Sequence, residues 1–238
     1  MSQDILLKVD NVHAHYDKSH VLHGVSLEVA KGETISLIGR NGSGRSTTLK
    51  AIMGLLPPSS GSVQLNGREL AGRPAYEICR AGIAYVPEER EVFANLTVEE
   101  NLRMGEQAGV DGTHKWSLQD MFDYFPRLKE RRNTYAGSLS GGEQQMLTMC
   151  RSLLGNPQLI LIDEPTEGLA PMIVAAVGEC IQDIHRKGVA VILVEQKLAI
   201  ALKVSSRMYV MGQGCIVYEG SPHEIVNNEQ LLADWLAV

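Results

Sequence analysis

The chain has 238 residues, a formal net charge of −6 and an isoelectric point near 5.7, and 5% of its residues are aromatic. This length is enough to bury the core of one large domain. Nucleic acids are held by clustered Lys and Arg and by stacked aromatic rings, so the composition argues against nucleic acid as a partner. The longest apolar run, residues 189–194, is far shorter than the ~20 residues of a membrane span. Residues 1–4 lack the features of a signal peptide, and we expect no leader.

The cysteines and histidines show no spacing typical of a metal site. There is no C-x-x-C pair and no H-E-x-x-H arrangement. We therefore expect the cysteines to be reduced thiols. The clustered histidines are expected to lie on a strand and a loop rather than to bind zinc. The residues concerned are Cys79, Cys150, Cys180 and Cys215, and His13, His15, His20 and His23.

Short apolar runs predict strands, and polar or glycine-rich segments separate them. The first two runs, residues 5–12 and 25–29, predict an antiparallel pair. Later runs alternate with helical stretches, which is typical of a parallel α/β sheet with ligand chemistry at the carboxyl ends of its strands. Further strands are expected at residues 34–38, 62–65, 83–86, 159–162, 189–194 and 208–211.

Helical patterns dominate between residues 88 and 154. Thr97 with Glu100 predicts a capping-box start for a helix reaching Met104, and residues 117–125 predict a second helix. In the tail, Ser221 followed by Pro222 predicts another helix start. We therefore divide the chain into a β lobe with the first part of the core (residues 1–87), a helical lobe (88–154) and the rest of the core (155–238).

A glycine-rich loop lies between the expected strand at 34–38 and an expected helix at 47–53. Such a loop turns successive N–H groups toward an anion, and the positive end of the new helix adds to the attraction. The loop matches the phosphate-binding pattern G-x-x-x-x-G-K-[ST], except that Arg45 replaces the lysine. A plain glycine turn that starts a helix is the alternative. The candidate nucleotide-binding residues here are Gly39, Arg40, Asn41, Gly42, Ser43, Gly44, Arg45, Ser46 and Thr47, with the Ser46 hydroxyl as a Mg²⁺ ligand.

Two carboxylates follow the apolar run at residues 159–162. Buried charge is costly without a partner, so Asp163 and Glu164 indicate a cationic or protic ligand at this strand end. Asp163 is suited to hold Mg²⁺, and Glu164 to polarise a water against a γ-phosphate. The alternative is a strand that merely runs out into solvent.

A second candidate anion cradle opens the helix that ends near Leu154. Ser140, Gly141 and Gly142 leave room for close approach at a helix start, and Glu143 follows them. The alternative is an ordinary capped helix. One chain thus carries two candidate phosphate-binding helix starts and a carboxylate pair.

Together these motifs resemble the ATP-binding subunits of ABC transporters along essentially the whole chain. The matching segments are the P-loop at 39–46, the LSGGEQQ signature at 139–145, the Walker B strand with Glu164, and the D-loop at 167–170. The resemblance implies a P-loop NTPase with a RecA-like α/β core, an N-terminal antiparallel β lobe and an inserted α-helical lobe. It also implies that two subunits sandwich ATP and Mg²⁺ head to tail, the P-loop of one facing the signature of the other.

Three further positions follow from the resemblance. Tyr16 matches the aromatic residue that stacks on adenine, with a strand-end core tyrosine as the alternative. Glu88 stands where many relatives have the Q-loop glutamine, so it would face Mg²⁺ or the attacking water, or belong to a solvated loop. Gln196 stands at the switch-histidine position and would contact the γ-phosphate without carrying a proton.

The segments at 87–88, 97–102, 169–171 and 194–196 resemble the ATPases of branched-chain amino acid importers and their amide or urea relatives. That likeness implies ATP-driven import by a peripheral subunit on the cytoplasmic face of the inner membrane. Its partners would be permease subunits, a second identical or homologous ATPase and, indirectly, a periplasmic solute-binding protein.

Arg45 leaves two functions open. Guanidinium keeps the charge of the P-loop lysine but is bulkier and planar. The first possibility is real hydrolysis in an adapted pocket, with Glu164, Arg45 and Gln196 as the catalytic residues. The second is a non-catalytic regulatory subunit paired with an active ATPase. The intact signature and Glu164 favour hydrolysis.

Overall fold

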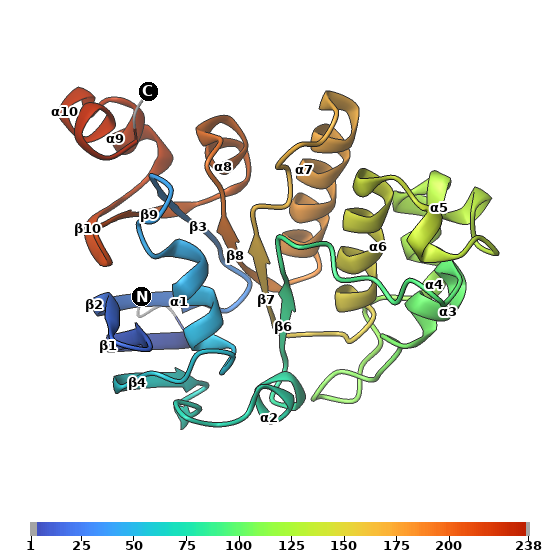
Figure 1. The fold of residues 1–238 in the computed structure, drawn as a ribbon, viewed down its shortest axis with the longest axis horizontal. Coiled ribbons are helices and arrows are strands. Elements are labelled where there is room, and N and C mark those ends of the chain that lie inside the picture. Colours follow the sequence, from blue (N-terminus) through green and yellow to red (C-terminus); the bar gives the residue numbers. More distant parts are fainter. Residues whose placement is uncertain (1–3, 237–238) are drawn as a thin grey trace.

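The computed structural model describes residues 4–236. Residues 1–3, on which the expectation of no leader partly rests, and residues 237–238 lie outside the described range. The chain forms two sheets, one with strand order β2-β1-β4-β5 and one with order β10-β9-β3-β8-β7-β6 (Figure 1). The first is antiparallel. In the second, β9, β3, β8, β7 and β6 run parallel and only β10 pairs antiparallel.

The strands begin and end where turn residues interrupt the apolar runs. Asn66 and Gly67, for example, separate β4 from β5, and both have positive φ angles, as tight turns often require. The strands are β1 (Ile5–Tyr16), β2 (Ser19–Ala30), β3 (Thr34–Gly39), β4 (Ser60–Leu65), β5 (Arg68–Glu69), β6 (Ile83–Val86), β7 (Leu159–Asp163), β8 (Ala190–Val194), β9 (Arg207–Gly212) and β10 (Cys215–Gly220).

The helices begin with local caps wherever the sequence supplies them. Thr97, Ser117, Ser140 and Ser221 each close a capping box with an acidic residue three positions later. No helix within residues 4–236 combines the length and the hydrophobicity needed to cross a membrane. The helices are α1 (Arg45–Ile52), α2 (Ala75–Arg80), α3 (Val98–Arg103), α4 (Leu118–Tyr124), α5 (Pro126–Glu130), α6 (Gly141–Leu153), α7 (Pro171–Arg186), α8 (Leu198–Val204), α9 (Pro222–Val226) and α10 (Glu229–Leu231), with short 3₁₀ and π turns at Ala136–Ser138 and Leu232–Leu236.

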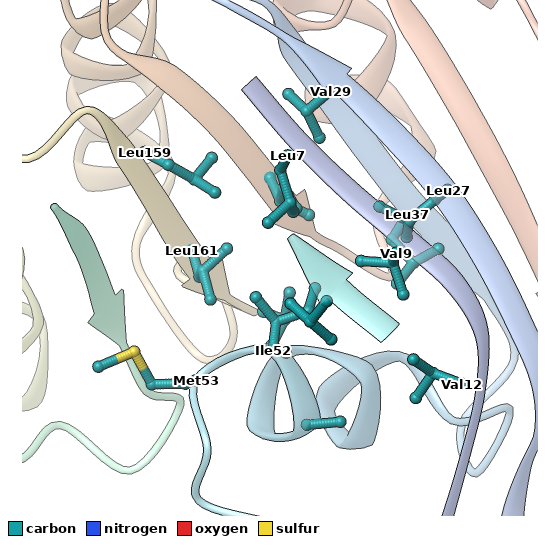
Figure 2. Packing of buried hydrophobic residues seen from close by; sticks show 14 of the residues in the cluster. Leu7, Val9, Val12, Leu27, Val29, Leu37, Ile52, Met53, Leu159 and Leu161 are labelled. Atoms are coloured by element: carbon teal, nitrogen blue, oxygen red, sulfur yellow. The ribbon is translucent and has the colours of Figure 1, made fainter. Parts of the chain in front are cut away.

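One hydrophobic core joins the two sheets around α1. Figure 2 shows Ile52 of α1 among side chains of β1, β2, β3 and β7, including Leu7, Leu37 and Leu161. These side chains are almost fully buried. Burying each large aliphatic side chain contributes about 2 kcal/mol relative to exposure, so this cluster fixes the P-loop helix between the sheets.

A second core covers the other face of the parallel sheet. Alternate residues of β7 take opposite sides: Leu159 and Leu161 face α1, whereas Ile160 and Ile162 join the cluster formed with α6 and α7. Both faces of these strands are therefore covered, as is usual for parallel sheets. The helices α3 to α6 lie between β6 and β7 in the chain and to one side of the sheet in space (Figure 1).

The expected fold class is confirmed: a parallel α/β core carries an antiparallel β lobe and a group of helices between β6 and β7. β1 and β2 extend beyond the expected ranges because they form a long hairpin of two twelve-residue strands, whose end is partly exposed. The sequence patterns did not predict α2, α5, α10, β5 or β10. In α2 only Ile78 is buried, so no helical apolar stripe exists to detect.

Arg207 on β9 connects the two sheets through polar contacts. Its guanidinium donates two hydrogen bonds to the Glu33 carboxylate, at 3.0 and 2.9 Å, and one to the carbonyl of Glu28, at 2.8 Å. It also reaches Glu219 and the Tyr209 hydroxyl at 2.6 and 2.7 Å. Because the Arg207 side chain is only 23% exposed, these hydrogen bonds are partly shielded from water.

We expect Arg207→Ala to lower the free energy of unfolding by about 2 kcal/mol, because Glu33 loses its charged partner in a half-buried position. The matched control is Arg127→Ala, which removes an exposed pair with Glu130 and should cost less than about 0.5 kcal/mol. Urea denaturation of both variants measures the difference. Equal losses would show that the Arg207 contacts do not join the sheets.

Candidate functional site

The loop between β3 and α1 forms a hollow at the carboxyl end of the parallel sheet. Gly42 and Gly44 have φ angles of 77° and 105°, which favour glycine. At Gly39 an added Cβ would overlap the carbonyl oxygen of Met211, so no side chain fits there. The loop lines a cavity of about 300 Å³, whose wall is formed by Asn41, Gly42, Ser43, Gly44, Arg45, Ser46, Thr47, Glu88, Glu164 and Glu167.

Ser46 and Asp163 meet in this hollow. The Ser46 hydroxyl donates to Asp163 Oδ1 at 2.9 Å, and the Tyr85 hydroxyl donates to Oδ2 at 3.1 Å. Asp163 is 1% exposed, and this burial raises the pKa of its carboxyl even though both hydrogen bonds favour the ionised form. A buried carboxylate beside a hydroxyl is a good pair of oxygen ligands for a hard cation.

Arg45 and Glu164 form an ion pair in the wall of the same hollow. Arg45 Nη2 lies 2.7 Å from Glu164 Oε1 and 3.1 Å from Asn41 Oδ1. The side chains are 4% and 10% exposed. Arg45 Nη1 is buried with no hydrogen-bond partner among residues 4–236. One half of the guanidinium is thus free to donate to a ligand such as phosphate.

Glu164 carries two signs of a functional residue. Its φ angle of 42° places it in the left-handed region, which is costly for a side chain larger than glycine. Burial raises the pKa of its carboxyl to about 7, opposed by the Arg45 charge and reinforced by Glu167. A carboxyl that titrates near neutral pH is suited to accept a proton from water.

The start of α6 forms the second candidate cradle. Ser140 caps the helix, and the Glu143 carboxylate accepts from its N–H at 2.9 Å and its hydroxyl at 2.8 Å. The Glu143 side chain is thereby committed to the capping box in this structure. Gly142 packs toward Leu169. A Cβ atom added at Gly142 would lie 3.6 Å from the Leu169 side chain. Within residues 4–236 no hydrogen bond joins this cradle to the P-loop.

Of the remaining expected site residues, only Glu88 lines the hollow. Glu88 is exposed and lines the cavity, and burial together with Glu167 and Asp163 raises the pKa of its carboxyl. Tyr16 ends β1 and is 44% exposed. Gln196 is exposed just after β8, whose Val194 pairs with Asp163. Arg40 points away and donates to the carbonyl of Ala233 at 2.9 Å.

Sequence reasoning missed three contacts that organise this site. Tyr85 bonds to Asp163, and the only sequence signal was a hydroxyl-bearing residue in the strand next to β7. Glu167 lines the hollow, although it was read only as part of the D-loop motif. The Thr166 hydroxyl donates to Glu195 at 2.7 Å, a contact between loops that no local pattern predicts.

The sequence from Leu22 to Glu167 matches a family model described as ABC transporter. The chain belongs to the ABC transporter family. It is 45% identical to the high-affinity branched-chain amino acid transport ATP-binding protein BraG of Pseudomonas aeruginosa, over 95% of this chain and 97% of that protein. It is 35% identical to the probable branched-chain amino acid transport ATP-binding protein LivF of Archaeoglobus fulgidus, over 94% and 96%.

Other ABC proteins are also similar to the chain. The lipopolysaccharide export system ATP-binding protein LptB of Haemophilus influenzae is 31% identical over 95% of both chains. The solved ADP conformation of MJ1267, an ATP-binding cassette of an ABC transporter, superposes with a TM-score of 0.81 at 25% identity, covering 96% of this chain and 97% of that one. The family assignment makes this chain an ABC ATPase, with the P-loop fold described above.

The strength of the Arg45–Glu164 pair is measurable without nucleotide. In a double-mutant cycle of Arg45→Ala and Glu164→Ala, we expect a coupling energy of about 1–3 kcal/mol, because the two charges touch in a largely buried position. The exposed pair Arg127–Glu130 serves as the control cycle, for which we expect under about 0.5 kcal/mol. If the loss of unfolding free energy in the double variant equals the sum of the losses in the two single variants, the result would contradict this contact.

Proposed function

We propose that this chain is the ATP-hydrolysing subunit of an importer for branched-chain amino acids or related small solutes. The single observation that carries the catalytic part is the contact of Ser46 with Asp163, which places the P-loop hydroxyl, a buried carboxylate and the adjacent Glu164 in one hollow. The class of solute rests on the likeness to BraG and LivF, which exceeds the likeness to the lipopolysaccharide exporter ATPase.

The P-loop would hold the phosphates of ATP. Residues 41–47 line the hollow, where their backbone N–H groups would donate to phosphate, and Arg45 Nη1, which has no partner among residues 4–236, would add a charged donor. Arg40 would contribute its backbone alone, since its side chain bonds to Ala233. Tyr16, half exposed at the end of the hairpin, would stack on adenine.

Ser46 and Asp163 fit a Mg²⁺ ion bound together with the phosphates, and Glu88 lies in the same cavity wall. Within the described residues, no group of three or more His, Cys, Asp or Glu side chains is arranged to hold a metal. That suits Mg²⁺, which commonly takes one or two protein ligands, substrate phosphates and waters. When bound, the ion would neutralise charge that develops on the phosphates.

Glu164 would act as the general base. It would take a proton from water as the water oxygen bonds to the γ-phosphorus and the bond to the ADP oxygen breaks. To do so it must leave Arg45, whose guanidinium would turn to the γ-phosphate. Arriving phosphate thus competes with Glu164 for the same charge and releases the base as it binds.

The Ser140–Gly142 cradle would bind the nucleotide held by a second subunit. The cradle has no hydrogen bond to the P-loop of its own chain among residues 4–236, which supports a role across a dimer interface. Ser140 would exchange its bond to Glu143 for one to phosphate, with Glu143 keeping the helix start in place. The second subunit would be another copy or a homologous ATPase.

A groove beside the helical lobe would receive the permease. It has a volume of about 520 Å³ and is lined by residues of the core, of the segment after β6 and of α6. Three large apolar side chains on its walls are exposed: Leu55 by 53%, Phe93 by 49% and Met104 by 60%. Such a patch suits an amphipathic helix of a membrane protein. This docking would hold the chain at the cytoplasmic face of the inner membrane, with a periplasmic binding protein acting through the permease.

Steady-state ATPase assays of the purified transporter test the catalytic proposal. We expect Glu164→Gln to lower kcat at least about 100-fold, because the general base is lost. Arg45→Lys should retain activity, since the charge in the P-loop is kept. Equal rates in wild type and Glu164→Gln would refute hydrolysis by this site.

Gln196 gives a pH test. An amide does not ionise, so position 196 should add no titration to the wild-type profile of kcat against pH. Gln196→His should add a titration to the profile at pH ~6.5 if the side chain reaches the γ-phosphate. A profile unchanged by the substitution would count against that contact.

The groove is tested by Met104→Glu, which places a charge on its apolar wall. We expect ATPase activity of the isolated chain to be preserved and its recovery with the permease to fall at least about tenfold. Val217→Glu, at an exposed apolar position on β10 outside the groove, is the control. Wild-type assembly of the Met104 variant would place the permease elsewhere.

A further inference from the structure

Arg90 lies in the segment that runs from β6 toward α3 (Figure 1), and its guanidinium reaches Gly141 at the start of α6. A Cβ atom on Gly141 would overlap Arg90 Nη1, so the guanidinium fills the space a side chain would take. Nη2 donates to the carbonyl of Glu167 at 3.2 Å. The charge is therefore held between the signature helix and the D-loop.

This position is unfavourable for a cation in the absence of an anion. The amino-terminal end of a helix carries partial positive charge, which repels guanidinium. Arg90 also has a φ angle of 52°, in the left-handed region. Among residues 4–236 it forms no ion pair within 4.0 Å, although Glu89 beside it pairs with Lys50 at 3.9 Å. Arg90 thus keeps its donors free of any direct ion pair, although carboxylates line the cavity beside it.

A second unsatisfied group lies one helical turn from Gly141. Gln145 is 2% exposed, and neither its amide nitrogen nor its amide oxygen has a hydrogen-bond partner among the described residues. Gln145 and Arg90 line the same cavity of about 380 Å³. Buried amides are normally hydrogen-bonded. The missing partners of Gln145 must therefore come from another molecule or from a closed state of the cavity.

The other cavity walls decide from which side an anion reaches Arg90. Glu88, Glu89, Glu164 and Glu167 line them, and their negative charge opposes entry of phosphate through the cavity. The P-loop hollow shares Glu88, Glu164 and Glu167 but does not include Arg90. The open approach is therefore along the start of α6, past Ser140 and Gly141.

We propose that Arg90 is a further catalytic residue, which contacts the γ-phosphate of ATP held in the P-loop of the partner subunit. The inference rests on the proposed function, because it places that nucleotide at the Ser140–Gly142 cradle. As water bonds to the γ-phosphorus and the bond to ADP breaks, the guanidinium stabilises the negative charge on the phosphoryl oxygens, while the proton passes to the general base. Gln145 gains its hydrogen bonds when the cavity closes around the nucleotide.

The experiment compares wild type, Arg90→Ala and Arg90→Lys in the purified transporter. We expect Arg90→Ala to lower kcat at least about tenfold with little change in KM, as for loss of a transition-state donor. Arg90→Lys should recover part of the rate. Orthovanadate trapping of Mg-ADP, which reports the transition-state geometry, should fall in parallel. Arg186→Ala, an exposed arginine at the end of α7, is the matched control.

A measurement on the isolated chain separates this role from a structural one. Because Arg90 acts on the nucleotide of the other subunit, the affinity of the Arg90→Ala chain for a fluorescent ATP analogue should stay within twofold of wild type. An equal loss of affinity and kcat, or a kcat within twofold of wild type in the transporter, would overturn the inference. An inactive wild-type transporter would instead refute the proposed function.

Discussion

The hydrogen bond from Ser46 to Asp163 is the contact on which the site depends, because it joins residues 117 positions apart. The sheet brings them together. β8 lies between β3 and β7, and its Val194 pairs with Leu37 on one side and Asp163 on the other. The P-loop and the acidic pair therefore leave the same sheet edge, and the two hydrophobic cores hold that edge in register.

Electrostatics explains why the hollow needs a ligand. Glu88, Glu164 and Glu167 line it and Asp163 bonds to Ser46 in its wall, whereas Arg45 is the one cation among the lining residues. Burial raises the pKa values of Asp163, Glu164 and Glu88, and the charge of Glu167 adds to the rise at Glu164 and Glu88, so the ionised forms are poorly compensated. A divalent cation with a nucleotide would restore the balance, because the metal neutralises the carboxylates while Arg45 meets phosphate.

Much of this arrangement was predictable from sequence because it depends on local patterns. Residues close together in the sequence determine the capping boxes and the strand before Asp163, and the structure contains each of them. The capping boxes are those at Thr97, Ser140 and Ser221. The Arg45–Glu164 pair was not predictable, since it depends on the rotamers of two distant residues. The same limit applies to Arg90, whose only sequence signal was a charged loop after β6.

The central claim is that Ser46 and Asp163 bind a Mg²⁺ ion together with ATP. Calorimetric titration of ATP into the purified chain, with Mg²⁺ and again with EDTA, tests it most directly. Wild type should bind ATP more tightly with Mg²⁺ than without. In Asp163→Asn, the ratio of these two affinities should be at least about tenfold smaller. Equal affinities with and without Mg²⁺ in wild type, or no binding at millimolar ATP, would contradict the account.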